Sequence, residues 1–170
     1  MISAKTHSNK PLISISDGKK LGEIKDLYLD RGMRQVAGVF LGTEGLFKRQ
    51  ALVIARSAVQ VYGIDAWLLS GSDKVMDLGE LPESETFTLA SELRGRKIQT
   101  EGGTEIGVVE DVLLDNEARV LGFSLGKVSV QGPLAERKAI ALEAITNMGS
   151  KNEPMTTILA QAESLALPSA

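Results

Sequence analysis

The stretch Leu21-Gly22-Glu23-Ile24-Lys25-Asp26-Leu27-Tyr28-Leu29-Asp30 occurs twice in this chain. Its second copy is Ile106-Gly107-Val108-Val109-Glu110-Asp111-Val112-Leu113-Leu114-Asp115, in which the glycine and both aspartates return as Gly107, Asp111 and Asp115. An internal repeat decides an architecture before any other pattern does, because each copy folds as a unit of the same kind. The sequence therefore predicts two similar domains in tandem.

Composition excludes several classes of site. The chain has 170 residues, a net charge of −3 and no cysteine, so disulfides, thiolate metal sites and cysteine nucleophiles are all excluded. The N-terminus lacks the pattern of a signal peptide. The most apolar run, residues 51–69, is interrupted by Arg56 and Asp65 and is too short and too charged to span a bilayer. We expect a soluble, cytoplasmic protein, and neither half is basic enough to predict direct nucleic-acid binding.

The apolar pattern within the repeated stretch changes phase. If Ile24 faces the core, strict alternation would bury Asp26 and expose Leu27 and Leu29. The second copy changes phase at the same place, between Val109 and Val112. The same phase change in both copies predicts a bulge or sharp bend, a feature that lets a small sheet curl into a barrel.

The remaining segments repeat in the same order. Strands are predicted at residues 36–41 and 120–125, with Gly38 and Gly122 at mid-strand, where glycine is costly unless a bend or a close backbone approach requires it. Single helical turns are predicted at residues 56–59 and 142–145. The predicted boundaries are a first repeat at 1–69, a linker at 70–85, a second repeat at 86–159 and a tail at 160–170. The fold class is mainly β, with two small tandem barrels and short helical turns. The tail is either a helical turn on the second repeat or frayed.

The residues that follow carry a family resemblance. Leu93-Arg94-Gly95-Arg96-Lys97-Ile98, then Gly102-Gly103, then the second copy of the repeated stretch, resemble the PRC-barrel domain. That domain occurs in the H subunit of photosynthetic reaction centres and in the C-terminal half of the ribosome maturation factor RimM. The resemblance covers residues 1–69 and 86–159, but neither the membrane helix of the H subunit nor the different N-terminal domain of RimM is evident. It implies a stand-alone tandem PRC-barrel protein that acts as a non-catalytic scaffold, and it brings no shared catalytic residues.

The aspartates Asp26, Asp30, Asp111 and Asp115 allow two interpretations. Within each repeat the two carboxylates lie four residues apart, which would suit a hard-cation site. Alternatively, Asp26 and Asp111 accept hydrogen bonds from backbone amides at the bulge, while Asp30 and Asp115 start the turns that follow. Recurrence in both copies favours the structural interpretation, and we predict no metal and no cofactor.

The loop Leu46-Phe47-Lys48-Arg49 is the candidate contact site for a partner. It places an aromatic side chain beside two cations, a combination that is frequent at interface hot spots. The alternative is that Phe47 folds back over an open barrel end. Trp67, the single tryptophan, lies in an apolar strand and is expected in the core rather than at an interface.

No catalytic residues are predicted. A Ser-His-Asp unit would need His7, the only histidine, near the N-terminus. The first hypothesis for function is therefore a protein-binding adaptor, and a homodimer is one assembly consistent with it. The alternative is a binder of a small ligand or divalent cation in a groove between the barrels.

Overall fold

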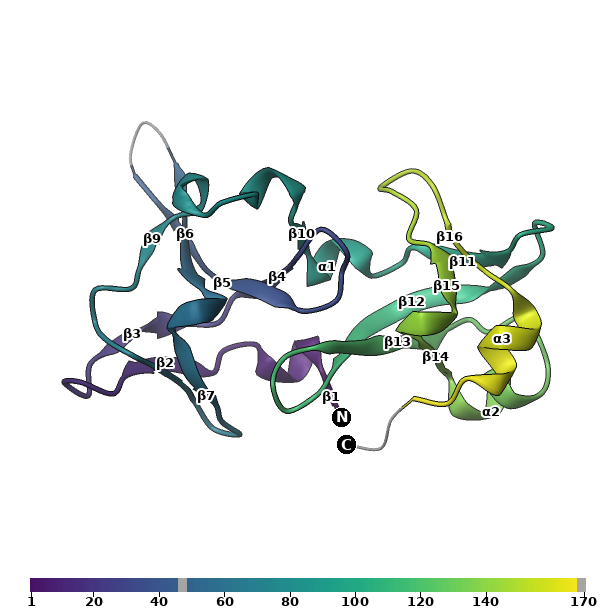
Figure 1. Ribbon diagram of the computed structural model, residues 1–170, viewed down its shortest axis with the longest axis horizontal. Helices are drawn as coiled ribbons and strands as arrows, with labels where there is room; N and C mark the ends of the chain where they lie inside the picture. The colour runs from purple at the N-terminus through teal and green to yellow at the C-terminus, as the bar shows by residue number, and fades with distance from the viewer. Residues whose placement is uncertain (46–48, 168–170) are drawn as a thin grey trace. The chain divides into compact units, whose positions relative to one another are not determined.

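Short β-strands follow one another along the chain, with short helical turns between some of them, as the repeated pattern of short apolar runs predicts. The computed structural model describes residues 1–45 and 49–167, and strands make up 45% of it (Figure 1). The mainly-β prediction is confirmed. The chain divides into an N-terminal unit, Ala4–Leu89, and a C-terminal unit made of Met1–Ser3 together with Ala90–Ala170.

The N-terminal unit holds a four-stranded sheet in the order β3-β2-β8-β7 and a five-stranded sheet in the order β10-β4-β5-β6-β9. Its strands are β2 (Pro11–Ser14), β3 (Lys20–Glu23), β4 (Asp26–Leu29), β5 (Val36–Glu44), β6 (Gln50–Ala55), β7 (Val59–Tyr62), β8 (Trp67–Leu69), β9 (Met76–Asp77) and β10 (Thr88–Leu89). Its 3-10 turns are η1 (Ala4–His7), η2 (Arg56–Ala58), η3 (Leu78–Glu80) and η4 (Ser84–Thr86).

The C-terminal unit has one seven-stranded sheet, with the path β14-β13-β12-β11-β16-β15 and with β1 paired to β12. Its strands are β1 (Ile2–Ser3), β11 (Lys97–Thr100), β12 (Glu105–Leu114), β13 (Val120–Gly126), β14 (Ala139–Ala141), β15 (Ile145–Asn147) and β16 (Met155–Thr157). Its helices are α1 (Ala90–Leu93), α2 (Pro133–Arg137), α3 (Leu159–Ser164) and the 3-10 turn η5 (Leu142–Ala144). The turns predicted at 56–59 and 142–145 are confirmed as η2 and η5.

The bend predicted in the repeated stretch is confirmed in both units. In the N-terminal unit β3 ends at Glu23 and β4 begins at Asp26, and these two strands belong to different sheets. In the C-terminal unit the stretch is the single strand β12, whose register against β13 shifts between Val109 and Asp111. Because the irregularity adds one residue, apolar side chains on both sides of it reach the core.

The predicted closed barrels are wrong, because the sheets of both units are open. In the C-terminal unit the pairing path begins at β14 and ends at β15, and η5 leads the chain from one to the other. This turn redirects the chain away from the edge of β14, so the next strand joins the far end of the sheet instead. In the N-terminal unit the break between β3 and β4 separates the strands further, into two sheets.

The first strand of each sequence repeat lies in the unit of the other repeat. Ile2 and Ser3 of β1 pair with Leu114 and Leu113 of β12. In the matching arrangement, Thr88 and Leu89 of β10 pair with Leu29 and Tyr28 of β4. The boundaries of the compact units therefore differ from those of the sequence repeat by one exchanged strand at each end.

The segment predicted as a linker, residues 70–85, is instead part of the N-terminal unit. Its strand β9 pairs with β6, and Leu81 forms a buried cluster with Tyr28 and Val53. The partly buried side chains packed against this cluster are Phe40, Ala55, Met76, Leu78, Phe87 and Leu89. Phe40, whose equivalent in the second repeat is Ser124, is thus one of the side chains that pack against this cluster.

Each mid-strand glycine lies where a neighbouring strand and a covering segment come close to its backbone. A Cβ on Gly38 would lie 3.1 Å from the carbonyl oxygen of Ile54 and 3.4 Å from Leu81 Cδ1. At Gly122 it would lie 2.7 Å from Leu167 Cδ2 and would clash with the carbonyl oxygen of Ile140. Of the bend and the close approach that these glycines allow, the structure shows a close approach at both positions.

The described part of the tail, residues 160–167, holds most of the helix α3 and is attached to its own unit. Arg137 of α2 donates from its guanidinium to the carbonyl oxygens of Ala162 (2.9 Å), Glu163 (3.0 Å) and Leu165 (3.2 Å), at the end of α3. A cation at the C-terminus of a helix satisfies carbonyls that lack a partner within the helix. Of the two alternatives for the tail, the helical turn is confirmed.

Candidate functional site

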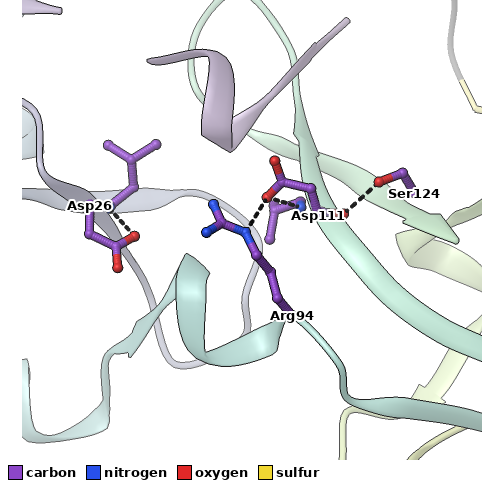
Figure 2. A network of polar contacts seen from close by, with 6 residues as sticks. Asp26, Arg94, Asp111 and Ser124 are labelled. Atoms are coloured by element: carbon purple, nitrogen blue, oxygen red, sulfur yellow. Dashed lines mark hydrogen bonds and ion pairs between the residues drawn. The ribbon is translucent and has the colours of Figure 1, made fainter. Parts of the chain in front are cut away.

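The aspartates of the repeated stretch accept hydrogen bonds from the backbone beside each irregularity, as Figure 2 shows. Asp26 Oδ1 accepts from the N–H of Leu27 at 2.8 Å. Asp111 Oδ1 accepts from the N–H of Val112, also at 2.8 Å. Backbone amides displaced from a regular ladder need an acceptor, and each carboxylate provides one.

The second aspartate of each pair organises the turn that follows its strand. Asp30 Oδ1 accepts from the N–H of Arg34 at 2.8 Å. Asp115 Oδ1 accepts from the N–H of Glu117 at 2.8 Å and from that of Arg119 at 2.9 Å. These bonds are those predicted by the structural interpretation, which is confirmed for all four aspartates. Within residues 1–45 and 49–167, no group of three or more His, Asp or Glu side chains is placed to hold a metal ion.

The buried Asp111 has a cationic neighbour that sequence reasoning missed. Arg94 Nε, on the turn after α1, lies 3.4 Å from Asp111 Oδ1 (Figure 2). The equivalent position in the first repeat is Ser8, so the repeat pattern gave no signal for this ion pair. On the neighbouring strand, the hydroxyl of Ser124 donates to the backbone oxygen of Asp111 at 3.4 Å.

His7 belongs to an aromatic cluster in the core of the N-terminal unit. Its ring meets that of Trp67 edge-on at a centroid distance of 5.1 Å, and Tyr62 meets Trp67 from another direction at 4.8 Å. Lys10 Nζ lies 3.0 Å from His7 Nδ1 and donates to the carbonyl oxygen of Gly63 at 3.2 Å. Burial lowers the pKa of Lys10, and the negative charge of Asp65 opposes this effect. The prediction that Trp67 is a core residue is confirmed.

The predicted partner loop lies mostly outside the described residues. Leu46, Phe47 and Lys48 are not among them, so contact through these side chains stays a prediction. Arg49 is described and exposed, and its Nη1 donates to Thr43 Oγ1 at 3.5 Å.

A cleft in the C-terminal unit gathers cations from two distant segments. It has a volume of about 460 Å³, and its side walls come from the start of β11 and from the turn before β16. It is lined by Gly95, Arg96, Lys97, Gln99, Lys151, Asn152, Glu153 and Pro154. A second hollow of about 250 Å³ is lined by Glu92 and shares Arg96 and Lys151 with the first. We call Arg96, Lys97, Lys151, Gln99 and Asn152 the basic cleft.

Arg96 is the fixed member of the basic cleft. Its Nη1 donates to the carbonyl oxygen of Met148 at 3.0 Å, which holds the guanidinium between the two segments. Burial lowers the pKa of Arg96, while the charge of Glu92 opposes that shift. The sequence contains the cluster around Arg96 and Lys97, but Lys151 lies more than fifty residues away. Only the parallel pairing of β11 with β16 brings the two segments together.

Comparison with known proteins identifies one family. A family model described as PRC-barrel domain matches residues 1–67 and 85–145, in two segments that correspond to the two sequence repeats. No curated protein matches the chain. Among the described residues, no helix is long and apolar enough to cross a membrane. The two matched segments cover most of the chain, and this protein therefore belongs to the PRC-barrel domain family.

Proposed function

We propose that this protein is a non-catalytic adaptor that binds other proteins through its tandem PRC-barrel repeats. Membership of the family supports a binding or scaffold role. The aspartates considered for a cation site instead accept hydrogen bonds from the backbone amides of residues that follow them.

The observation that carries the proposal is the basic cleft. Three cationic residues line it together with Gln99 and Asn152, and the lining contains one acidic residue, Glu153. Amide and ammonium groups are hydrogen-bond donors for carboxylates. The class of partner that fits is a protein with an exposed acidic segment. The loop at 46–49 is a second contact that the adaptor could use, on the N-terminal unit.

Affinity capture with charge-reversed variants tests this proposal. The bait proteins are the wild type and the double variant Lys97→Glu with Lys151→Glu. The matched control is Lys127→Glu with Lys138→Glu, which reverses two exposed lysines elsewhere in the same unit. We expect the wild type and the control to retain a common set of acidic proteins, each bound at least about tenfold more weakly by the cleft variant.

A parallel bait tests the loop, with Phe47, Lys48 and Arg49 all changed to alanine. Partners lost only from this variant would move the contact from the basic cleft to the loop. Equal capture by all variants would contradict both sites, and no specific capture by the wild type would contradict the adaptor function itself.

A further inference from the structure

The four-stranded sheet of the N-terminal unit has one buried and one partly exposed face. Leu12, Trp67 and Leu69 point inward and are fully buried. Because side chains alternate along a strand, the neighbours of these residues point outward. The outward neighbours are Ile13 on β2 and Leu68 on β8.

The outward side chains form a continuous apolar surface. Ile13 pairs with Leu68, and Leu68 pairs with Val61 of β7, so the three lie side by side across the sheet. Ile15 follows two residues after Ile13 on the same side. Exposure is 55% for Ile15 and 46% for Val61. We call Ile13, Ile15, Val61 and Leu68 the apolar face.

The second repeat shows that the fold does not require this face to be apolar. The equivalent strands β11, β16 and β15 pair in the same way, Gln99 with Thr156 and Thr156 with Asn147. Ile13, Leu68 and Val61 are thus replaced by Gln99, Thr156 and Asn147, and Ile15 by Glu101. A surface that is polar in one copy and apolar in the other, at the same positions of one fold, indicates a role beyond folding.

An ion pair borders the apolar face on the edge strand β3. Lys20 is paired with Ile13 and Glu23 with Pro11, so both charged side chains stand on the outward side. Their Nζ and Oε1 atoms lie 2.8 Å apart. One edge of the apolar face therefore carries a cation, Lys20, followed along the same strand by an anion, Glu23.

We propose that the apolar face is the interface between two copies of this chain. The two faces stack with a two-fold axis between them that runs across the strands. Each β3 then lies antiparallel over the other, so Lys20 of one copy meets Glu23 of the second and Glu23 meets Lys20. The apolar side chains of each copy cover those of the other, and the charged border of each copy is complementary to that of the other. An isologous interface requires this self-complementarity.

The size of the face sets the strength of this association. Four strands span about 15 Å and four residues along them about 13 Å, from standard sheet spacings. Such an area is below the roughly 800 Å² per partner of stable complexes. The dimer is therefore weak and reversible.

Sedimentation of the full chain over a concentration series tests the proposal. The decisive variant carries Ile13→Gln, Val61→Asn and Leu68→Thr, the residues that the second repeat has at the equivalent positions. We expect the wild type to dimerise reversibly and this variant to associate at least about tenfold more weakly. The matched control, Glu101→Gln with Thr156→Ser on the equivalent face of the C-terminal unit, should dimerise like the wild type.

A charge exchange tests the orientation and does not depend on the apolar substitutions being tolerated. Lys20→Glu should weaken dimerisation, and Lys20→Glu combined with Glu23→Lys should restore it. A wild type that stays monomeric at millimolar concentration would overturn the proposal. So would a folded triple variant that dimerises like the wild type. Failure of the charge exchange to restore association would overturn the two-fold arrangement.

Discussion

At the scale of single residues, the aspartates of the repeat act on the backbone. Asp26 and Asp111 occupy the point where the strand departs from its regular course, and each accepts the amide of the next residue. An aspartate there stabilises an irregularity that the apolar pattern needs. The loss of unfolding free energy when such an aspartate is replaced depends on how deeply it is buried. Asp111 is the more buried of the two.

Replacing Asp111 by alanine is expected to lower the free energy of unfolding by about 1–3 kcal/mol. The change leaves the Val112 amide without its acceptor and Arg94 without its carboxylate. Urea unfolding of the purified chain measures the loss. The control is Glu110→Ala, which alters the adjacent, exposed side chain. Equal stability of the two variants would contradict this role for Asp111.

The placement of the aspartates predicts that divalent cations leave the melting temperature unchanged. Ca²⁺ takes about six to eight oxygen ligands, and within the described residues no group of three or more His, Asp or Glu side chains is placed to hold an ion. In a thermal-unfolding series we expect no rise in melting temperature with either ion. A rise that saturates with ion concentration would reveal specific binding to the folded state and would favour the alternative cation-binding function.

At the scale of elements, the mid-strand glycines let a covering segment pack against each sheet. Gly38 lies beneath Leu81 and Gly122 beneath Leu167. The sequence predicted a close approach at both glycines, but not which segment approaches. The polar composition of residues 70–85 resembles a linker, because the apolar residues in it that pack are too widely spaced to form a recognisable strand.

Gly122→Ala is expected to destabilise the C-terminal unit by about 1–3 kcal/mol, since the new methyl group has no room against Ile140 and Leu167. The new methyl group of Gly38→Ala would lie farther from its neighbours, at 3.1 Å and 3.4 Å. We therefore expect a smaller loss in the free energy of unfolding than for Gly122→Ala. Gly126→Ala is the control, because its nearest neighbour, Val108 Cγ2, would lie at an ordinary 3.5 Å. Urea unfolding ranks the three variants, and the reverse order for Gly38 and Gly122 would contradict this explanation.

The exchanged strands make a second prediction at this scale. Deleting residues 1–3 removes β1 from the edge of β12, although the two are far apart in sequence. We expect amide protection against hydrogen exchange to fall in β12, while β4 keeps its partner β10. Loss of protection in β4 with β12 unchanged would contradict the exchange.

At the scale of the whole molecule, the two units share a fold and differ in their surfaces. The N-terminal unit has the apolar face, and the C-terminal unit has the basic cleft with Lys151 in a turn two residues longer than its counterpart. Sequence reasoning found the repeat, the family and the bend, because these depend on local patterns. It missed the pairing of Arg94 with Asp111 and the meeting of Lys151 with Arg96, because both depend on contacts between distant segments.

Giving both units an apolar face should change the assembly from a closed dimer to larger species. The variant Gln99→Ile with Asn147→Val and Thr156→Leu copies the first repeat onto the second. If one face per chain makes a closed dimer, two faces per chain permit open-ended assembly. We expect light scattering to report species larger than dimers for this variant only. A variant that stops at the same size as the wild type would contradict this expectation.

The exchange of first strands also orders events during synthesis. Residues 1–3 leave the ribosome well before their partners on β12, Leu113 and Leu114. The N-terminal unit is complete once Leu89 has been added, because β10 supplies its last strand. Strand β1 therefore waits through the folding of one unit before it joins the other, and a chain released before β12 is made would leave β1 unpaired.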